Sequence, residues 1–203
     1  MYIFQKRFGE AESLLQRTYV LCEKALAGTY AGHAETTDAL SSSLNNLGSL
    51  CYVQGRYQEA QSLYQRAYPV WEELYGPQHP NIAILLYNLG CNYQGMRDYE
   101  ASERYHLRAL TMCEQLLGAM HRHTARSLNS LGELYCVQER YAEAEPLLRR
   151  ALHILEVSLG PTHAEVAAHL ENLARLLHAT ARGREAQELE ARANSIRNVK
   201  KTL

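Results

Sequence analysis

The sequence contains no uninterrupted apolar run of about 18 residues, the length that a membrane-spanning helix needs. Its first eight residues do not combine a basic leader with an apolar stretch, so they do not indicate a secretory signal. It also lacks an excess of basic residues, because 21 lysines and arginines face 22 aspartates and glutamates and the net charge is −1. Proteins that bind nucleic acid or a membrane surface normally show a basic excess. We therefore expect neither kind of partner.

The motifs of common enzymes are missing as well. There is no phosphate loop of the G-x-x-x-x-G-K-[ST] or G-x-G-x-x-G type, no H-E-x-x-H and no G-x-S-x-G. We predict a protein that is not an enzyme and uses no cofactor.

The cysteines indicate the redox state of the surroundings. Their number is odd and none of them forms a C-x-x-C pair: Cys22, Cys51, Cys91, Cys113 and Cys136. This usage is typical of free thiols in a reducing cytoplasm, which is the location we predict.

A repeat runs through the chain. The segment from Leu44 to Gly48 returns at residues 86–90, 128–132 and 170–174, so that Leu47, Leu89, Leu131 and Leu173 lie 42 residues apart. A second segment, Arg56 to Ala60, follows in step and returns near residues 98, 140 and 182. A period of this length is the signature of a solenoid built from stacked helical units.

Each copy of the repeat predicts two helices. In the first copy, Leu44, Leu47 and Cys51 fall on one helical face, and Gly55 then interrupts the pattern. A second helix follows, with one apolar face made by Ala60, Tyr64 and Ala67. Small residues such as Gly48 and Gly132 are predicted to let the two helices approach closely, while large residues fill the space between them.

Three of the nine histidines recur at the same place between copies: His79, His121 and His163. Stacked helix pairs would hold them roughly 20 Å apart. A metal ion bound at about 2 Å by each ligand cannot collect them. We therefore predict that they cap loops and that the chain has no metal site.

The register divides the chain as a single array over residues 1–203. It comprises a partial first repeat over 1–27, an extended loop over 28–37, and repeats over about 38–79, 80–121, 122–163 and 164–203. The last repeat places polar Glu190 and Asn194 where earlier copies are mostly apolar, as expected of a capping repeat. The first residues align with residues 50–57, so the chain enters partway through a helix. This leaves an apolar edge of Ile3, Phe4 and Phe8, which fits a fragment of a longer array or an edge sealed by a partner.

These motifs resemble the tetratricopeptide repeat. The 42-residue spacing, with a Leu-Gly pair and a histidine between copies, is similar to the longer subtype of kinesin light chains and nephrocystin-type proteins. The resemblance implies an all-α fold, a right-handed α-solenoid of antiparallel helix pairs. It also implies a concave groove, lined by the first helix of each pair, that takes a peptide of a partner protein.

Carried over position by position, the resemblance gives a candidate groove: Asn46, Ser49, Tyr87, Asn88, Arg126, Asn129, Glu133, Asn172 and Arg175. Asparagines there can exchange hydrogen bonds with a peptide backbone. They can equally bond within or between helices, and the two arginines can be solvated residues with local glutamate partners. Because Glu133 and Glu171 dilute the basic charge, we do not expect a preference for acidic peptides.

Three functions remain open from the sequence. The first is an adaptor that binds a peptide of a partner protein in the groove. The second is a self-association module that forms a homo-oligomer through the edge of Ile3, Phe4 and Phe8. The third is a docking or sensor segment of a larger multidomain signalling protein.

Overall fold

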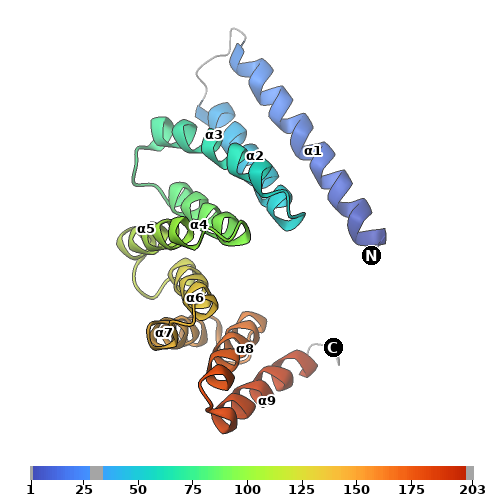
Figure 1. Cartoon of the computed structure of the whole chain (residues 1–203). Helices are drawn as coiled ribbons and strands as arrows, with labels where there is room; N and C mark the ends of the chain where they lie inside the picture. The colour runs from blue at the N-terminus through green and yellow to red at the C-terminus, as the bar shows by residue number, and fades with distance from the viewer. Residues whose placement is uncertain (1, 28–33, 200–203) are drawn as a thin grey trace. The chain divides into compact units, whose positions relative to one another are not determined.

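The computed structural model describes residues 2–27 and 34–199, of which residues 2–8, 25–27 and 199 are described by their backbone alone. Within these ranges the chain forms nine helices and no strand (Figure 1). They are α1 (Tyr2–Ala27), α2 (Ala34–Val53), α3 (Tyr57–Tyr75), α4 (Pro80–Gly95), α5 (Tyr99–Leu117), α6 (Arg122–Val137), α7 (Tyr141–Leu159), α8 (Ala164–Ala179) and α9 (Gly183–Val199). No helix of the described chain is long and apolar enough to cross a membrane. The repeat boundaries stay a prediction; the helices nearest to them begin at Pro80, Arg122 and Ala164.

The helices belong to two compact units, an N-terminal unit over residues 1–105 and a C-terminal unit over residues 106–203. In the N-terminal unit α2 packs on α3, and α1 packs on α2. In the C-terminal unit α6 packs on α7, and α8 packs on α9. The predicted fold class, an all-α solenoid of helix pairs, is confirmed.

In the pairs α2–α3 and α6–α7 a glycine on the first helix faces a large residue on the second. A methyl group added at Gly48 of α2 would lie 2.6 Å from the ring of Tyr64 on α3. One added at Gly132 of α6 would lie 2.8 Å from the side chain of Leu148 on α7. Both large residues are almost fully buried, so the core of each pair consists of side chains inserted against bare backbone.

The recurring histidines, which were predicted to cap loops, are the N-caps of helices. His79, His121 and His163 each precede a first helix with an extended backbone. Nδ1 of each ring accepts a hydrogen bond of 3.2 Å from the backbone N–H two residues later. The cap satisfies one of the free N–H groups that every helix leaves at its N-terminus. It also fixes the direction in which each first helix leaves the preceding turn.

The turn between the two helices of each repeat requires a left-handed backbone at one position. The φ angle there is +76° at Gly55, +63° at Arg97, +62° at Glu139 and +59° at Ala181. Glycine adopts this conformation without penalty, whereas a residue with a Cβ pays about 1 kcal/mol or more. Only the first of the four turns therefore carries the residue that its geometry favours.

We expect Ala181→Gly to stabilise the protein by roughly 0.5–1 kcal/mol, because it relieves this strain at an exposed position. Gly55→Ala should cost about 1 kcal/mol for the converse reason. The matched control is Ala179→Gly, two residues earlier at the last residue of α8, where no positive φ is relieved and glycine should not stabilise the protein. Urea denaturation followed by circular dichroism measures all three. Equal effects of glycine at positions 179 and 181 would contradict the assignment.

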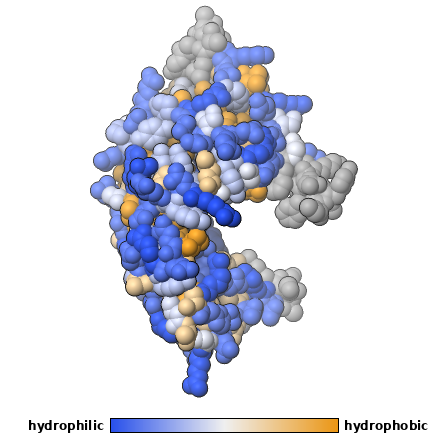
Figure 2. Space-filling view, viewed as in Figure 1, coloured by the Kyte–Doolittle hydropathy of each residue, from blue (hydrophilic) through white to orange (hydrophobic). Residues whose placement is uncertain are grey.

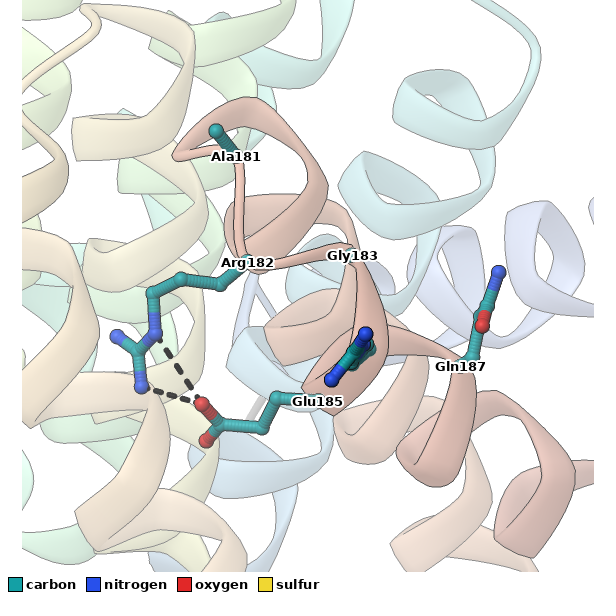
Figure 3. A pocket seen from close by; sticks show the side chains of 6 residues that line it. Ala181, Arg182, Gly183, Glu185 and Gln187 are labelled. Atoms are coloured by element: carbon teal, nitrogen blue, oxygen red, sulfur yellow. Dashed lines mark hydrogen bonds and ion pairs between the residues drawn. The ribbon is translucent and has the colours of Figure 1, made fainter.

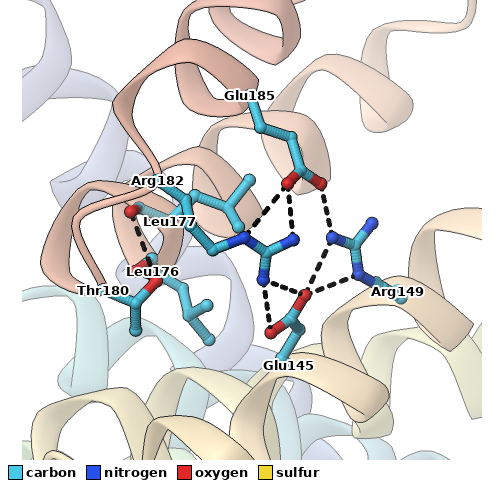
Figure 4. Close-up of polar contacts among 7 residues, drawn as sticks. All are labelled: Glu145, Arg149, Leu176, Leu177, Thr180, Arg182 and Glu185. Carbon is cyan, nitrogen blue, oxygen red and sulfur yellow. Dashed lines mark hydrogen bonds and ion pairs between the residues drawn. The ribbon is translucent and has the colours of Figure 1, made fainter.

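A closed ring of four charges ties α7 to the start of α9 (Figure 4). Arg149 bonds to Glu145 at 2.8 Å and to Glu185 at 2.5 Å. Arg182 bonds to Glu145 at 2.7 Å and to Glu185 at 2.5 Å. The side chains are partly exposed, so each pair alone stabilises the fold little, but a network holds the geometry better than isolated pairs. Arg56, at the equivalent turn of the first repeat, likewise bonds to Glu12 and Glu59.

The N-terminal part of the chain differs from the sequence-based expectation in two ways. The alignment pairs the first residues with residues 50–57, which contain the end of a first helix, but α1 continues without interruption from Tyr2 to Ala27. At the position of Gly55 the alignment has Lys6, and no left-handed turn forms there. The loop predicted over residues 28–37 ends early, since α2 begins at Ala34, with the acidic Glu35 in its first turn. Residues 28–33 and the side chains of Ile3, Phe4 and Phe8 lie outside the described residues.

His106 on α5 is the most buried histidine of the described chain. It has no exposed surface, and burial lowers its pKa to about 4. It occupies the repeat position of Tyr64 and Leu148, which are also buried. Because an imidazole in the unfolded chain titrates at about 6.5, the unfolded state binds more protons than the folded state between these two values.

Stability should therefore fall as the pH drops from about 6.5 to about 4, by as much as roughly 3 kcal/mol from His106 alone. His106→Leu, which copies residue 148, should remove this part of the loss. Urea denaturation at pH 7 and at pH 4.5 measures the difference between wild type and variant. His153→Leu, which replaces an exposed histidine of α7, is the control. A pH dependence unchanged by His106→Leu would show that other groups govern acid sensitivity.

Candidate interaction face

The residues proposed from the sequence lie on the first helix of each repeat. In the N-terminal unit they are on α2 (Asn46, Ser49) and α4 (Tyr87, Asn88). In the C-terminal unit they are on α6 (Arg126, Asn129, Glu133) and α8 (Asn172, Arg175). Each unit therefore presents its own set of candidate residues.

In the N-terminal unit the first helices α2 and α4 are joined by a hydrogen bond between two asparagine side chains, which we call an amide link. Nδ2 of Asn88 donates to Oδ1 of Asn45 at 2.8 Å and approaches Oγ of Ser49 at 3.5 Å. Oγ of Ser49 donates to the backbone carbonyl of Asn45 at 3.0 Å and accepts from the hydroxyl of Tyr64 at 3.3 Å. Burial raises the pKa of Tyr64 to about 12, so this hydroxyl stays protonated and remains a donor. Asn46, by contrast, is exposed.

In the C-terminal unit the same link is part of a closed ring of hydrogen bonds. Nδ2 of Asn172 donates to Oδ1 of Asn129 at 3.0 Å, and Nδ2 of Asn129 donates to Glu133 at 2.9 Å. The guanidinium of Arg175 closes the ring by donating to Glu133 at 3.0 Å and to Oδ1 of Asn172. Four of the residues proposed from the sequence are thus brought together.

The two amide links occupy equivalent places. Asn129 follows Asn45, and Asn172 follows Asn88, by two repeats each. Asn45 was not among the residues proposed from the sequence, although its counterpart Asn129 was. The signal that identifies it is the asparagine two positions before Leu47 and Leu131, which the other two copies replace by tyrosine or glutamate.

The charges of the C-terminal face are largely paired. Arg175 bonds to Glu133, Arg197 of α9 bonds to Glu171 at 2.6 Å, and Arg122 bonds to Glu165 at 3.0 Å. Burial raises the pKa of Glu133, and the nearby Arg175 opposes that rise. The face therefore carries mixed charge rather than an excess of positive charge. For this reason we still expect no preference for acidic peptides.

Two hollows in the surface of the C-terminal unit lie on α8 and α9. One of about 340 Å³ is lined by Glu171, Arg175, Glu190 and Asn194. Another of about 630 Å³ surrounds the start of α9, where the guanidinium of Arg182 turns toward Glu185 (Figure 3). The surface in the view of Figure 2 is mostly hydrophilic, with hydrophobic atoms in small patches. Among the described residues, no three histidine, cysteine, aspartate or glutamate side chains are grouped to hold a metal ion.

The Asn45–Asn88 link predicts an energetic coupling between α2 and α4. In a double-mutant cycle of Asn45→Ala and Asn88→Ala, the coupling in unfolding free energy should be about 1 kcal/mol, because either single change leaves a half-buried amide without its partner. The cycle of Asn46→Ala with Asn88→Ala is the control and should give less than about 0.5 kcal/mol. The reverse order of the two couplings would show that Asn46 holds the helices together.

Comparison with known proteins identifies the family of the repeat. Residues 40–115 and 123–198 match the family model of the tetratricopeptide repeat. No curated protein matches the sequence.

Several solved structures share the fold. BtubC (BKLC) from P. vanneervenii is 20% identical with a TM-score of 0.79, and the match covers 94% of this chain and 74% of that one. A Podosopora anserina structure of nearly identical TPR-like repeats of a kinesin light chain is 19% identical with a TM-score of 0.63, covering 92% and 96%. The apo form of RapI is 18% identical with a TM-score of 0.71, covering 97% of this chain and 51% of that one. At these identities the likeness concerns the fold alone.

Proposed function

The chain belongs to the tetratricopeptide repeat family, and we propose that it is a non-catalytic adaptor that binds a peptide segment of a partner on the first helices of its repeats. The fold supports a role as a protein-interaction scaffold. The finer statement, that a peptide binds at the face made by α2 and α4 or by α6 and α8, is the proposal. Since one fold serves many functions, this proposal depends on the residues of the site and not on the fold.

The observation that carries the proposal is the pair of amide links. A side chain that is already held in one rotamer loses little entropy when it binds a ligand. Asn88 and Asn172 are held in this way and remain half-exposed. Because their Nδ2 groups bond within each unit, we assign their carbonyl oxygens to the partner. An amide oxygen has two lone pairs, so that of Asn172 can accept from a peptide N–H while it accepts from Arg175.

The two units favour segments of different character. The N-terminal face offers uncharged groups, namely Asn46, Ser49, Tyr87 and Asn88. The C-terminal face offers Arg126, Glu133 and Arg175, the last two already paired with each other. An extended segment whose backbone supplies most of the hydrogen bonds fits both faces better than a strongly acidic or basic one.

Further parts of the function stay predictions. All five cysteines are free thiols, which supports the predicted cytoplasmic location. The alternative, a docking segment of a larger signalling protein, predicts a longer reading frame around this sequence.

The proposal is tested with a displayed library of random peptides, from which the full chain selects binders. For a selected peptide, Asn88→Ala or Asn172→Ala should weaken the affinity measured by calorimetry about fivefold, because one hydrogen bond of roughly 1 kcal/mol is lost. Asn46→Ala should weaken it in the same direction for peptides that contact the N-terminal unit.

The matched controls are Gln65→Ala on α3 and Gln187→Ala on α9, which truncate exposed amides on second helices. They should leave affinity unchanged. Circular dichroism and thermal melting check that each variant keeps its fold. If the asparagine variants bind as wild type does, or if the controls lose binding instead, the first helices are not the binding surface.

A further inference from the structure

Apolar side chains on the outer face of α1 are more exposed than their counterparts in later repeats. Leu14 and Leu21 are 64% and 66% exposed, and Val20 next to them is also exposed. In the register of the repeat, Leu21 corresponds to Val70 and Met112, which are half-buried, and to Ile154 and Ile196, which are 0% and 6% exposed. Ile154 and Ile196 lie on α7 and α9, which pack on α6 and α8, whereas α1 packs on α2.

The exposed side chains follow the spacing of a helix-packing seam. Glu10, Leu14, Arg17, Leu21 and Lys24 are separated alternately by four and three residues, so they share one face of α1. Beside the seam is a hollow of about 350 Å³, lined by Gln16, Arg17, Val20 and Leu21. These four residues form two neighbouring rows along the helix, and the groove between such rows accepts a side chain of a second helix.

We propose that this face of α1 binds α1 of a second copy of the chain, in an antiparallel, two-fold symmetric contact. A two-fold contact must be complementary to itself. Leu14 of each copy enters the hollow beside Leu21 of the other. The same register brings Glu10 at one end of the seam alongside Lys24 of the second copy, twice per dimer. Arg17 of the two copies lies near the symmetry axis, where like charges oppose the contact.

The charge pattern selects this occupant. A negative residue at one end of the seam and a positive residue at the other attract when two α1 helices run in opposite directions, and repel when they run in parallel. The surface differs from the face proposed for peptide binding, so the two proposals are tested independently. Its residues, Glu10 to Lys24, do not include Ile3, Phe4 and Phe8, the edge proposed from the sequence.

Sedimentation equilibrium of the full chain over a concentration series tests the dimer. Leu14→Glu and Leu21→Glu should each raise the dissociation constant by about a hundredfold or more, because each change places two charges in the contact. The matched control is Val157→Glu, at a side chain of α7 that is also 64% exposed, and it should leave the constant unchanged. Circular dichroism checks the fold of each variant.

Charge exchange tests the direction of the two helices. Glu10→Lys or Lys24→Glu alone should weaken the dimer severalfold, the two together should restore it, and Arg17→Gln should tighten it. A chain that stays monomeric at every concentration overturns the proposal, as does a dimer unaffected by Leu14→Glu and Leu21→Glu. Failure of the double exchange to restore association overturns the antiparallel contact. None of these outcomes bears on peptide capture by the first helices.

Discussion

The close approach of the two helices within the pairs α2–α3 and α6–α7 is the constraint on which the rest of the structure depends. At Gly48 and at Gly132 there is no space for even a methyl group, because Tyr64 and Leu148 lie directly against the backbone. A small residue at one position therefore fixes both the distance and the rotation of the first helix against the second. That rotation also fixes the direction in which the side chains on the opposite side of the first helix point.

This rotation explains which polar residues link neighbouring first helices. With Leu47 and Gly48 directed into the pair, Asn45 is buried between α2 and the next first helix, and it meets Asn88 there. The same packing arrangement places Asn129 against Asn172 in the C-terminal unit. An unpaired amide at such a place would cost the free energy of desolvation, so each asparagine requires the other. The links thus follow from the packing of the pairs and do not replace it.

The sequence allowed the fold to be predicted, because the fold depends on features that recur at a fixed distance. The period of 42 residues indicates the fold class, and the histidines between copies, predicted to cap loops, are helix N-caps. The amide links were harder to see, since their partners are 43 residues apart and are not equivalent positions. A side chain on one helix reaches a neighbour one position displaced in the next, which an alignment of repeats does not show. In the N-terminal region the alignment with residues 50–57 does not extend to the turn. Lys6 aligns with Gly55, yet α1 continues through it, whereas Arg97 and Glu139 form left-handed turns at the same repeat position.

A single repeat of 42 residues does not contain a complete amide link on the face of the first helices. Asparagine precedes the Leu-Gly motif by two positions in the first and third copies, but tyrosine and glutamate replace it in the second and fourth. An amide link needs this asparagine in one repeat and Asn88 or Asn172 in the next, so it forms once for every two repeats. The described chain has one link in each compact unit. A polar pair that is satisfied in only one register penalises every other register, which makes it a device for alignment rather than for stability alone. Two repeats joined in this way, rather than one, are therefore the element that holds a set of polar groups in fixed positions.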